Sequence, residues 1–192
     1  MPRRSDTRER VIRTAAGLFR AQGYHATGLN QVLAEGGLPK GSLYFHFPGG
    51  KEQLAVESVQ LSGRELGEGI AAALASTPEP ADALARVLAL LGEHLVATGF
   101  REGCPVATVA LDAAAQSEPI RAACADVYDS WQDLVAQHLR AAGVADAEGL
   151  ATVLVAAAEG AILLARTRRD VTPLQTVGTH LRALLTPERR PE

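Results

Sequence analysis

The feature that most constrains the fold is the spacing of the apolar residues, which recur at helical intervals along almost the whole chain. Glycine and proline fall mainly between these stretches, alanine is abundant and β-branched residues are few. Apolar residues make up 47% of the 192 residues, which is enough to bury a real core. Repeats of three and four residues indicate helices. The sequence therefore predicts an all-α protein of about nine helices.

Capping residues and breaks place the expected helices. The first begins near Ser5 or Asp6 and stops at Gly23, and Thr27 caps a short second helix. After a Gly36-Gly37 turn, a third short helix begins near Pro39, which suits a first helical position. Six longer helices are expected over about 51–74, 81–98, 105–116, 118–142, 146–168 and 172–186. We expect a head over 1–50, a helical body over 51–187 and a disordered polar tail over 188–192.

Charge is distributed unevenly between head and body. Residues 1–51 hold eight basic and three acidic side chains, whereas residues 52–192 hold eleven basic and nineteen acidic ones. The net charge of −3 would by itself argue against nucleic acid. A basic head on an acidic body fits a DNA-contacting module carried by a body that does not touch DNA, although a chance fluctuation is the alternative.

Neither export nor membrane insertion is indicated. The N-terminus lacks the apolar region of a signal peptide, and the longest apolar stretch, 150–165, is interrupted by Glu159. Cys104 and Cys124 do not make a disulfide framework, and buried small hydrophobes are the commoner reading of such residues. We expect a cytoplasmic protein with reduced thiols and no membrane partner.

Two short helices joined by a glycine turn within the first 50 residues are typical of a helix-turn-helix. The second helix must enter a major groove about 12 Å wide, so its exposed face needs small or basic residues near its N-terminus. Lys40, Gly41 and Ser42 meet this need, and Tyr44 and His46 can donate to phosphates. Thr27 and Lys51 each stand at a helix start, where a phosphate can bind. Phe47 is expected in the core, and His46 alone could be a solvated surface residue.

Residues 12–54 resemble the DNA-binding domain of the TetR family of repressors. The resemblance is carried by Leu38-Pro39-Lys40-Gly41-Ser42-Leu43-Tyr44-Phe45-His46-Phe47-Pro48 and Lys51-Glu52-Gln53-Leu54, with Ile12, Ala15, Ala16, Leu18, Phe19 and Gly23 in the first helix. It implies phosphate contacts by Thr27, Tyr44, His46 and Lys51, and base reading by Lys40, Gly41 and Ser42. It also implies a dimer that binds a pseudo-palindromic operator in double-stranded DNA and leaves it when a small apolar inducer binds.

Two departures from the family pattern stand out. Pro39 occupies a position where serine is common, so one hydroxyl contact is lost. The Gly49-Gly50 pair lengthens the link to the fourth helix by one residue. That pair, together with Gly103-Cys104, is similar to a branch containing regulators of drug efflux.

The body is where this family usually holds its inducer, in an apolar pocket with a few polar groups. The candidate pocket residues are His94, Phe100, Cys104, Tyr128, Trp131 and His138. Trp131, the only tryptophan, lies on the inward stripe of its helix, and an ordinary core aromatic is the alternative. No other cofactor is indicated.

The last two helices are the dimer interface that the resemblance implies, and their sequence agrees. Small and apolar residues form stripes that could pair two helices from each subunit into a four-helix bundle. The stripes consist of Val153, Ala157, Gly160, Ala161 and Leu164 in one helix and Leu174, Val177, Leu181, Leu184 and Leu185 in the next. Packing of both stripes within the monomer is the alternative.

Other classes find less support. A small helical enzyme would need a catalytic or metal motif, but the five histidines lack the His-Glu-x-x-His spacing and no Gly-x-Ser-x-Gly elbow occurs. Gly49-Gly50-Lys51 lacks the other residues of a phosphate loop. A helix-turn-helix that has lost DNA binding is disfavoured by intact Lys40, Tyr44, His46 and Lys51. We therefore expect a regulator that is neither an enzyme nor a metalloprotein, acting in repression or in activation.

Overall fold

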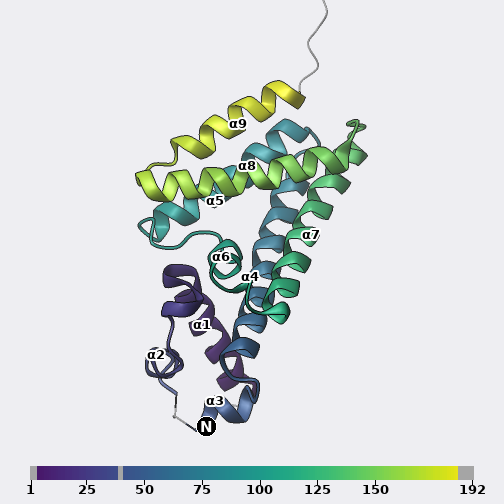
Figure 1. Cartoon of the computed structure of the whole chain (residues 1–192). Helices are drawn as coiled ribbons and strands as arrows, with labels where there is room; N and C mark the ends of the chain where they lie inside the picture. The colour runs from purple at the N-terminus through teal and green to yellow at the C-terminus, as the bar shows by residue number, and fades with distance from the viewer. Residues whose placement is uncertain (1–3, 39–40, 186–192) are drawn as a thin grey trace, which may run out of the picture. The chain divides into compact units, whose positions relative to one another are not determined.

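A computed structural model of the chain describes residues 4–38 and 41–185, and for residues 4–6 and 42 the backbone alone. Every regular element in this part is an α-helix (Figure 1). The nine described helices are α1 (Arg4–Ala26), α2 (Leu29–Glu35), α3 (Ser42–His46), α4 (Gly50–Ala75), α5 (Pro80–Ala97), α6 (Ala107–Ala113), α7 (Glu118–Ala141), α8 (Ala147–Arg168) and α9 (Thr172–Leu185). The predicted fold class is confirmed. Lys40 and the predicted tail 188–192 lie outside the described residues.

The chain divides into two compact units, and the division differs from the predicted head and body. Unit 1 comprises Met1–Glu65 and Glu102–Val127, and unit 2 comprises Leu66–Arg101 and Tyr128–Glu192. The long helices α4 and α7 each contribute residues to both units. The helix-turn-helix therefore does not stand alone, because α6 packs against α1 in the same unit. Spacing along one helix does not show which distant helix will cover it.

The core of unit 1 is built from one face of each of its helices. α1 packs against both α2 and α6. Its buried face follows the predicted helical spacing, and α2, α3 and α4 add residues to the same core. The buried apolar residues here include Val11, Ala15, Phe19, Val32, Leu33, Leu43, Phe47, Leu54, Val59, Val106, Val109 and Ile120.

Two glycines in unit 1 permit close approaches between helices. Gly23 has φ +85°, and a Cβ there would collide with the Asp112 carboxylate of α6. A Cβ at Gly63 in α4 would lie 2.5 Å from a methyl group of Val127 in α7. Gly23 (φ +85°, ψ 174°) interrupts the helical backbone at the predicted stop, and a further short helical segment carries α1 on to Ala26.

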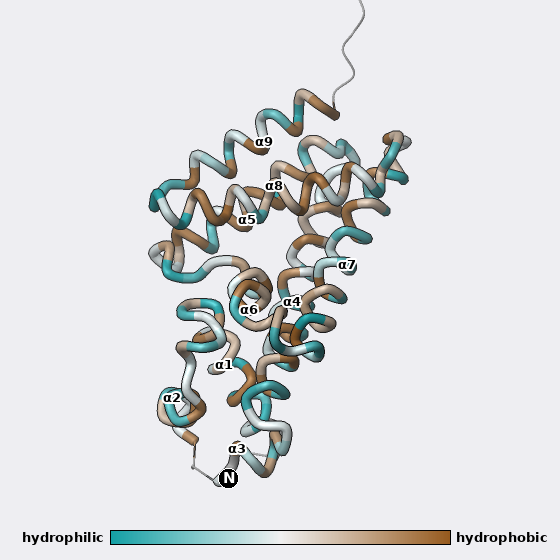
Figure 2. Tube along the Cα trace, in the orientation of Figure 1, coloured by the Kyte–Doolittle hydropathy of each residue, from teal (hydrophilic) through white to brown (hydrophobic). Residues whose placement is uncertain are grey.

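Unit 2 is a layer of packed helices in which α5 contacts both α8 and α9, and α8 contacts α9. Hydrophobic and hydrophilic bands alternate along α9 (Figure 2), as expected for a helix with one buried face. The buried apolar residues include Ile70, Leu74, Leu84, Leu88, Leu95, Trp131, Val135, Leu139, Leu154, Ile162, Leu174 and Leu181.

Among the described helices, α8 is the one that is long and apolar enough to cross a membrane. It buries Leu154, Ala161, Ile162 and Ala165 and packs against α5 and α9. The apolar residues of α8 therefore contribute to the core of unit 2, and α8 is a partly buried core helix.

Local details at other helix ends differ from the predictions. The N-cap of α2 is Gly28, which makes no side-chain capping bond, so the predicted capping role of Thr27 is wrong. The third helix begins at Ser42 and ends at His46, which makes it shorter than predicted. α6 is likewise confined to Ala107–Ala113, whereas the remaining boundaries agree to within one or two residues.

Candidate nucleic-acid interface

The turn that joins α2 to α3 is anchored on both sides by buried apolar residues. Val32 and Leu33 of α2 are buried, as are Leu43 and Phe47 on the other side of the turn. Gly37 adopts φ +60°, and the Leu38 amide donates to the Leu33 carbonyl at 2.9 Å. This is a left-handed helix end closed by glycine, which reverses the chain tightly. Buried apolar residues therefore anchor both α2 and α3 in the core of unit 1.

The outer face of α3 carries aromatic and polar side chains in direct contact with solvent. Tyr44 is 68% exposed and Phe45 is 62% exposed, while His46 is half-buried. Gly41, which directly precedes the helix, is also exposed. Tyr44 and His46 thus lie where the sequence predicts phosphate ligands, although Lys40 and the side chain of Ser42 lie outside the described part.

Thr27 has a different role from the one predicted. Its side chain is 1% exposed, and its hydroxyl donates to the Gly23 carbonyl at 2.7 Å. The Gln22 amide donates to the same hydroxyl at 3.3 Å. Thr27 therefore holds the corner between α1 and α2, and its hydroxyl is not available to a phosphate in this conformation.

Lys51 is held in place by the end of α1. Its ammonium donates to the His25 carbonyl at 3.4 Å and lies 4.4 Å from the centre of the Tyr24 ring. Burial lowers the pKa of Lys51. A cation over an aromatic face gains energy from the ring quadrupole. Lys51 therefore braces the junction of α1 and α4, and its position at the start of α4 is fixed by that contact.

Helix α6 joins this arrangement through Asp112. The His25 amide donates to the Asp112 carboxylate at 3.4 Å, and the His25 Nε2 lies 2.9 Å from the Asp112 carbonyl oxygen. Gly23 gives the space for this approach. The helix-turn-helix is thereby tied to α6 within unit 1.

Several arginines that give the head its basic charge are paired with carboxylates from outside residues 1–51. Arg8 lies 2.5 Å from Glu57, Arg13 lies 2.5 Å from Glu65, and Arg20 lies 3.2 Å from Glu102. Hydrogen bonds to Glu65 and Glu9 raise the pKa of Arg13. The count of charges along the chain therefore overstates the positive charge that unit 1 offers to DNA.

Unit 2 contains a small apolar cavity of about 50 Å³. Trp131 is the one residue of the six predicted for the pocket that lines it, within the part of the chain that the structure describes. The lining consists of Leu66, Ile70, Leu84, Val87, Leu88, Leu91, Trp131, Val135, Leu154, Val155, Ala158, Glu159, Ile162 and Leu181. Glu159 is the one charged residue in this lining. It was visible in the sequence as the residue that interrupts the apolar stretch 150–165.

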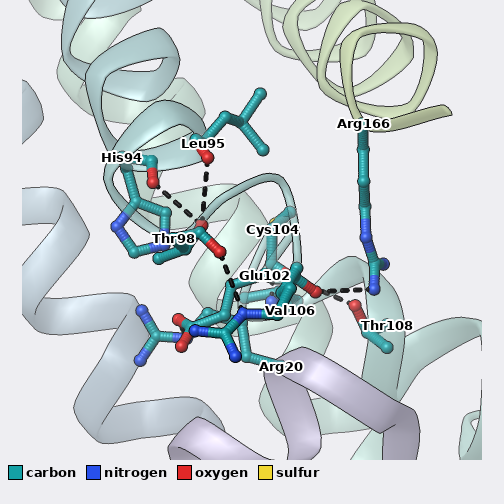
Figure 3. Close-up of polar contacts among 10 residues, drawn as sticks. Arg20, His94, Leu95, Thr98, Glu102, Cys104, Val106, Thr108 and Arg166 are labelled. Atoms are coloured by element: carbon teal, nitrogen blue, oxygen red, sulfur yellow. Dashed lines mark hydrogen bonds and ion pairs between the residues drawn. The ribbon is translucent and has the colours of Figure 1, made fainter. Parts of the chain in front are cut away.

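Four other predicted pocket residues belong to unit 2. Tyr128 and His138 lie in α7, whereas His94 and Phe100 lie at the C-terminal end of α5 and just after it. The Tyr128 ring meets the Trp131 ring edge-on, with the centroids 5.6 Å apart. His138 is half-buried, and its Nε2 has no hydrogen-bond partner in the described part. Phe100 takes φ +60° just after α5, where the Thr98 hydroxyl donates to the His94 carbonyl at 3.0 Å (Figure 3). These four do not line the cavity beside Trp131, and their place in a ligand pocket stays a prediction.

Cys104 belongs to unit 1, where it precedes α6 (Figure 3). Its sulfur accepts from the amides of Val106 and Ala107, both at 3.4 Å, and its carbonyl accepts from the Thr108 hydroxyl at 3.3 Å. Both cysteines are buried and reduced. Burial raises the pKa of Cys124 to about 11, so its thiol is protonated at neutral pH. The place of Cys104 in the ligand pocket stays a prediction, and its sulfur is held by the amides that open the turn before α6.

The predicted dimer stripes divide into exposed and buried members. Val153 is 55% exposed and Leu164 is 47% exposed, and Gly160 lies on the same open face of α8. Ala157 and Val177 are half-buried. In contrast, Ala161, Leu174 and Leu181 are buried inside unit 2, so they are core residues and their assignment to the interface is wrong. Leu163, which belongs to neither predicted stripe, is exposed, and so is Leu184 of the second stripe.

Comparison with known proteins gives consistent matches along the chain. Residues 11–57 match the profile of bacterial regulatory proteins of the tetR family, and residues 80–180 match the LmrA/YxaF-like C-terminal domain of transcriptional regulators. The regulator LmrA of Bacillus subtilis is 40% identical over 94% of this chain and 97% of its own length. YxaF of the same organism, an uncharacterised regulator, is 38% identical over 96% of this chain and 98% of its own length.

Solved structures share the fold. A regulatory protein TetR from Rhodobacter sphaeroides superposes with a TM-score of 0.85 at 25% identity, covering 93% of this chain and 98% of that one. A TetR transcriptional regulator from Chloroflexus aurantiacus superposes with a TM-score of 0.79 at 31% identity, covering 95% of this chain and 96% of that one.

Proposed function

Because the chain belongs to the TetR family of transcriptional regulators, in its LmrA/YxaF-like branch, we propose that it is a cytoplasmic repressor whose homodimer binds a pseudo-palindromic operator. A small apolar ligand releases it. The observation that carries the DNA-binding role is the exposed face of α3, where Tyr44 and His46 stand beside a helix start that Gly41 leaves open. The buried Leu43 and Phe47 fix that face relative to the rest of unit 1.

Tyr44 and His46 are the proposed phosphate ligands in each half-site, and Lys40, Gly41 and Ser42 at the start of the reading helix are the proposed base-reading residues. Such contacts set the register of the protein on the duplex, while groove-facing groups read the bases. Lys51 supports the same surface by bracing α4 against Tyr24 and His25. A dimer would place two reading helices about 34–36 Å apart on successive major grooves.

The proposed dimer interface is the open face of α8 with the neighbouring part of α9. Val153, Ala157, Gly160 and Leu164 follow one another at intervals of three and four residues, so they share one side of the helix. Exposed aliphatic side chains around a glycine allow close packing of two helices. Leu184, 70% exposed, extends this apolar surface on α9.

The proposed ligand site is the cavity beside Trp131. Its volume of about 50 Å³ is below the roughly 300–1,000 Å³ of drug-sized sites, so a ligand must enlarge it. A ligand that binds the enlarged state more tightly shifts the population away from the operator-binding state. This coupling is reciprocal, so operator DNA must weaken ligand binding by the same factor.

The test of DNA binding uses the purified protein and the intergenic DNA beside its own gene, with affinity measured across a range of salt concentrations. We expect tight, sequence-selective binding that the double variant Lys40→Ala, Tyr44→Ala loses. The control is Arg86→Ala, which removes one exposed charge from unit 2. Weak binding that is indifferent to sequence and to the double variant would contradict the proposal.

The test of ligand release uses the same operator with a panel of small apolar compounds. Trp131 is the only tryptophan in the chain, so a fluorescence change reports on the cavity directly. We expect compounds that change this fluorescence to weaken operator binding. Compounds that change the fluorescence and strengthen operator binding would make the protein a ligand-dependent DNA binder in place of an inducible repressor.

A further inference from the structure

Phe45 is a large apolar residue at the centre of the most exposed face of α3. Its side chain is 62% exposed, and its ring meets the His46 ring edge-on with the centroids 5.1 Å apart. Phe47, two residues later, is fully buried. The core of unit 1 is therefore closed without Phe45, and another reason is needed for an aromatic side chain at this position.

The geometry of the helix shows what Phe45 faces. Each residue turns an α-helix by about 100°, and within α3 the buried Leu43 marks the direction of the core. Phe45, about 200° further round, lies nearly opposite to that direction, whereas Tyr44 and His46 lie to either side of it. In a reading helix, the residue that points straight away from the core enters the groove most deeply, and its flanking residues meet the backbones that border the groove.

The chemistry of the side chain limits what it can read. A phenyl ring has no donor for a phosphate oxygen and no partner for the polar edges of the bases. The apolar group that a base pair offers in the major groove is the C5-methyl group of thymine. Gly41, which is exposed and has no side chain, lies one helical turn before Phe45 and leaves room for the ring beside the bases.

We propose that Phe45 is a specificity-determining residue whose ring packs against the C5-methyl group of one thymine in each operator half-site. This inference rests on the proposed operator binding, because it names the base that the same surface reads. It also separates the roles on α3: Tyr44 and His46 position the helix, and Phe45 selects the sequence.

The test removes methyl groups one at a time from an operator that the protein has been shown to bind. Each thymine is replaced by deoxyuridine, which lacks the C5-methyl group and keeps every hydrogen-bonding group. With the unsubstituted protein, we expect one position per half-site at which this replacement weakens binding, roughly fourfold for the burial of one methyl group. With Phe45→Ala, the same replacement should have no further effect, while Phe45→Leu should keep part of it.

The outcomes are distinguishable. Loss of the uracil effect in Phe45→Ala, with its retention in Tyr44→Phe, would support the proposal. Equal sensitivity to uracil in the unsubstituted protein and in Phe45→Ala, or no sensitivity at any position, would overturn it while leaving operator binding intact. Failure of the unsubstituted protein to select any sequence would overturn the proposed function itself. Thermal unfolding of each variant shows whether a loss of binding comes from a loss of fold.

Discussion

Two helix faces, one on α3 in unit 1 and one on α8 in unit 2, both expose large apolar side chains, but their surroundings differ. On α3 the exposed Tyr44 and Phe45 are aromatic and stand beside His46. On α8 the exposed Val153, Leu163 and Leu164 are aliphatic, and the nearby Gly160 leaves the backbone open.

This difference shows that the exposure of apolar side chains alone does not identify whether a helix face binds DNA or a second subunit. Aromatic rings with hydrogen-bonding neighbours suit a polyanion whose bases offer methyl groups. Aliphatic side chains around a glycine suit a second helix, because close packing needs a smooth surface and small residues. We therefore expect substitutions on α3 to change DNA binding and substitutions on α8 to change assembly.

The largest expected effect is a difference in folding stability between substitutions at Phe47, which caps the end of α3, and at Phe45, which lies within α3. Phe47→Ala should lower the free energy of unfolding by about 3–5 kcal/mol, because it empties a fully buried site in the core of unit 1. Phe45→Ala should change it by less than about 0.5 kcal/mol, because its ring is mostly in solvent. Urea denaturation of both variants measures the difference. A similar loss in both would mean that Phe45 is a structural residue and is not free to read DNA.

A smaller effect should appear when α8 is made acidic. Leu164→Glu places a carboxylate on the proposed interface, where an unpaired buried charge costs roughly 3 kcal/mol. The dimer should dissociate into folded monomers, which sedimentation velocity measures directly. The matched control is Leu111→Glu on α6, whose side chain is 84% exposed and lies on no proposed interface. Dimers that persist in Leu164→Glu at micromolar concentration would place the interface elsewhere.

The course of the helices could be predicted from the sequence, since apolar spacing and glycine or proline breaks report on local structure. The exposure of Tyr44 and the burial of Trp131 also follow from the spacing, while the binding roles of Tyr44, His46 and Trp131 stay predictions. Leu174 and Leu181 show where such reasoning stops: a stripe says that a face is covered, but not whether a helix of the same chain or of a partner covers it. In the structure both are buried within unit 2.

Thr27 and Lys51 show a second limit. Each lies near a helix start, as predicted, but the direction of each side chain depends on residues that only the fold brings near. Thr27 turns inward to the Gly23 carbonyl, and Lys51 is drawn to the Tyr24 ring and the His25 carbonyl. The pairing of Arg13 with Glu65 and of Arg20 with Glu102 is also a long-range contact, so the charge of the head could not be derived from its own residues.

The smallest expected effect has opposite signs in the monomer and in the dimer. In Gly160→Ala, the added Cβ meets nothing within 4 Å in the single chain, so the variant should stabilise α8 by roughly 0.5–1 kcal/mol through helix propensity. On the proposed interface the same methyl group holds the partner helix away, because close helix packing depends on small residues at the crossing. We therefore expect weaker dimerisation together with a more stable folded chain.

Sedimentation equilibrium measures the dimerisation affinity. Denaturation in the monomeric Leu164→Glu background measures the free energy of unfolding. Gly17→Ala in α1 is the matched control, because its added Cβ also meets nothing within 4 Å and it lies in a helix outside the proposed interface. It should show the gain in stability alone. If Gly160→Ala strengthened the dimer as well as the fold, the open face of α8 would not be a close helix crossing. The proposal that α8 binds a second subunit, whereas α3 binds DNA, would then have to rest on Leu163 and Leu164 alone.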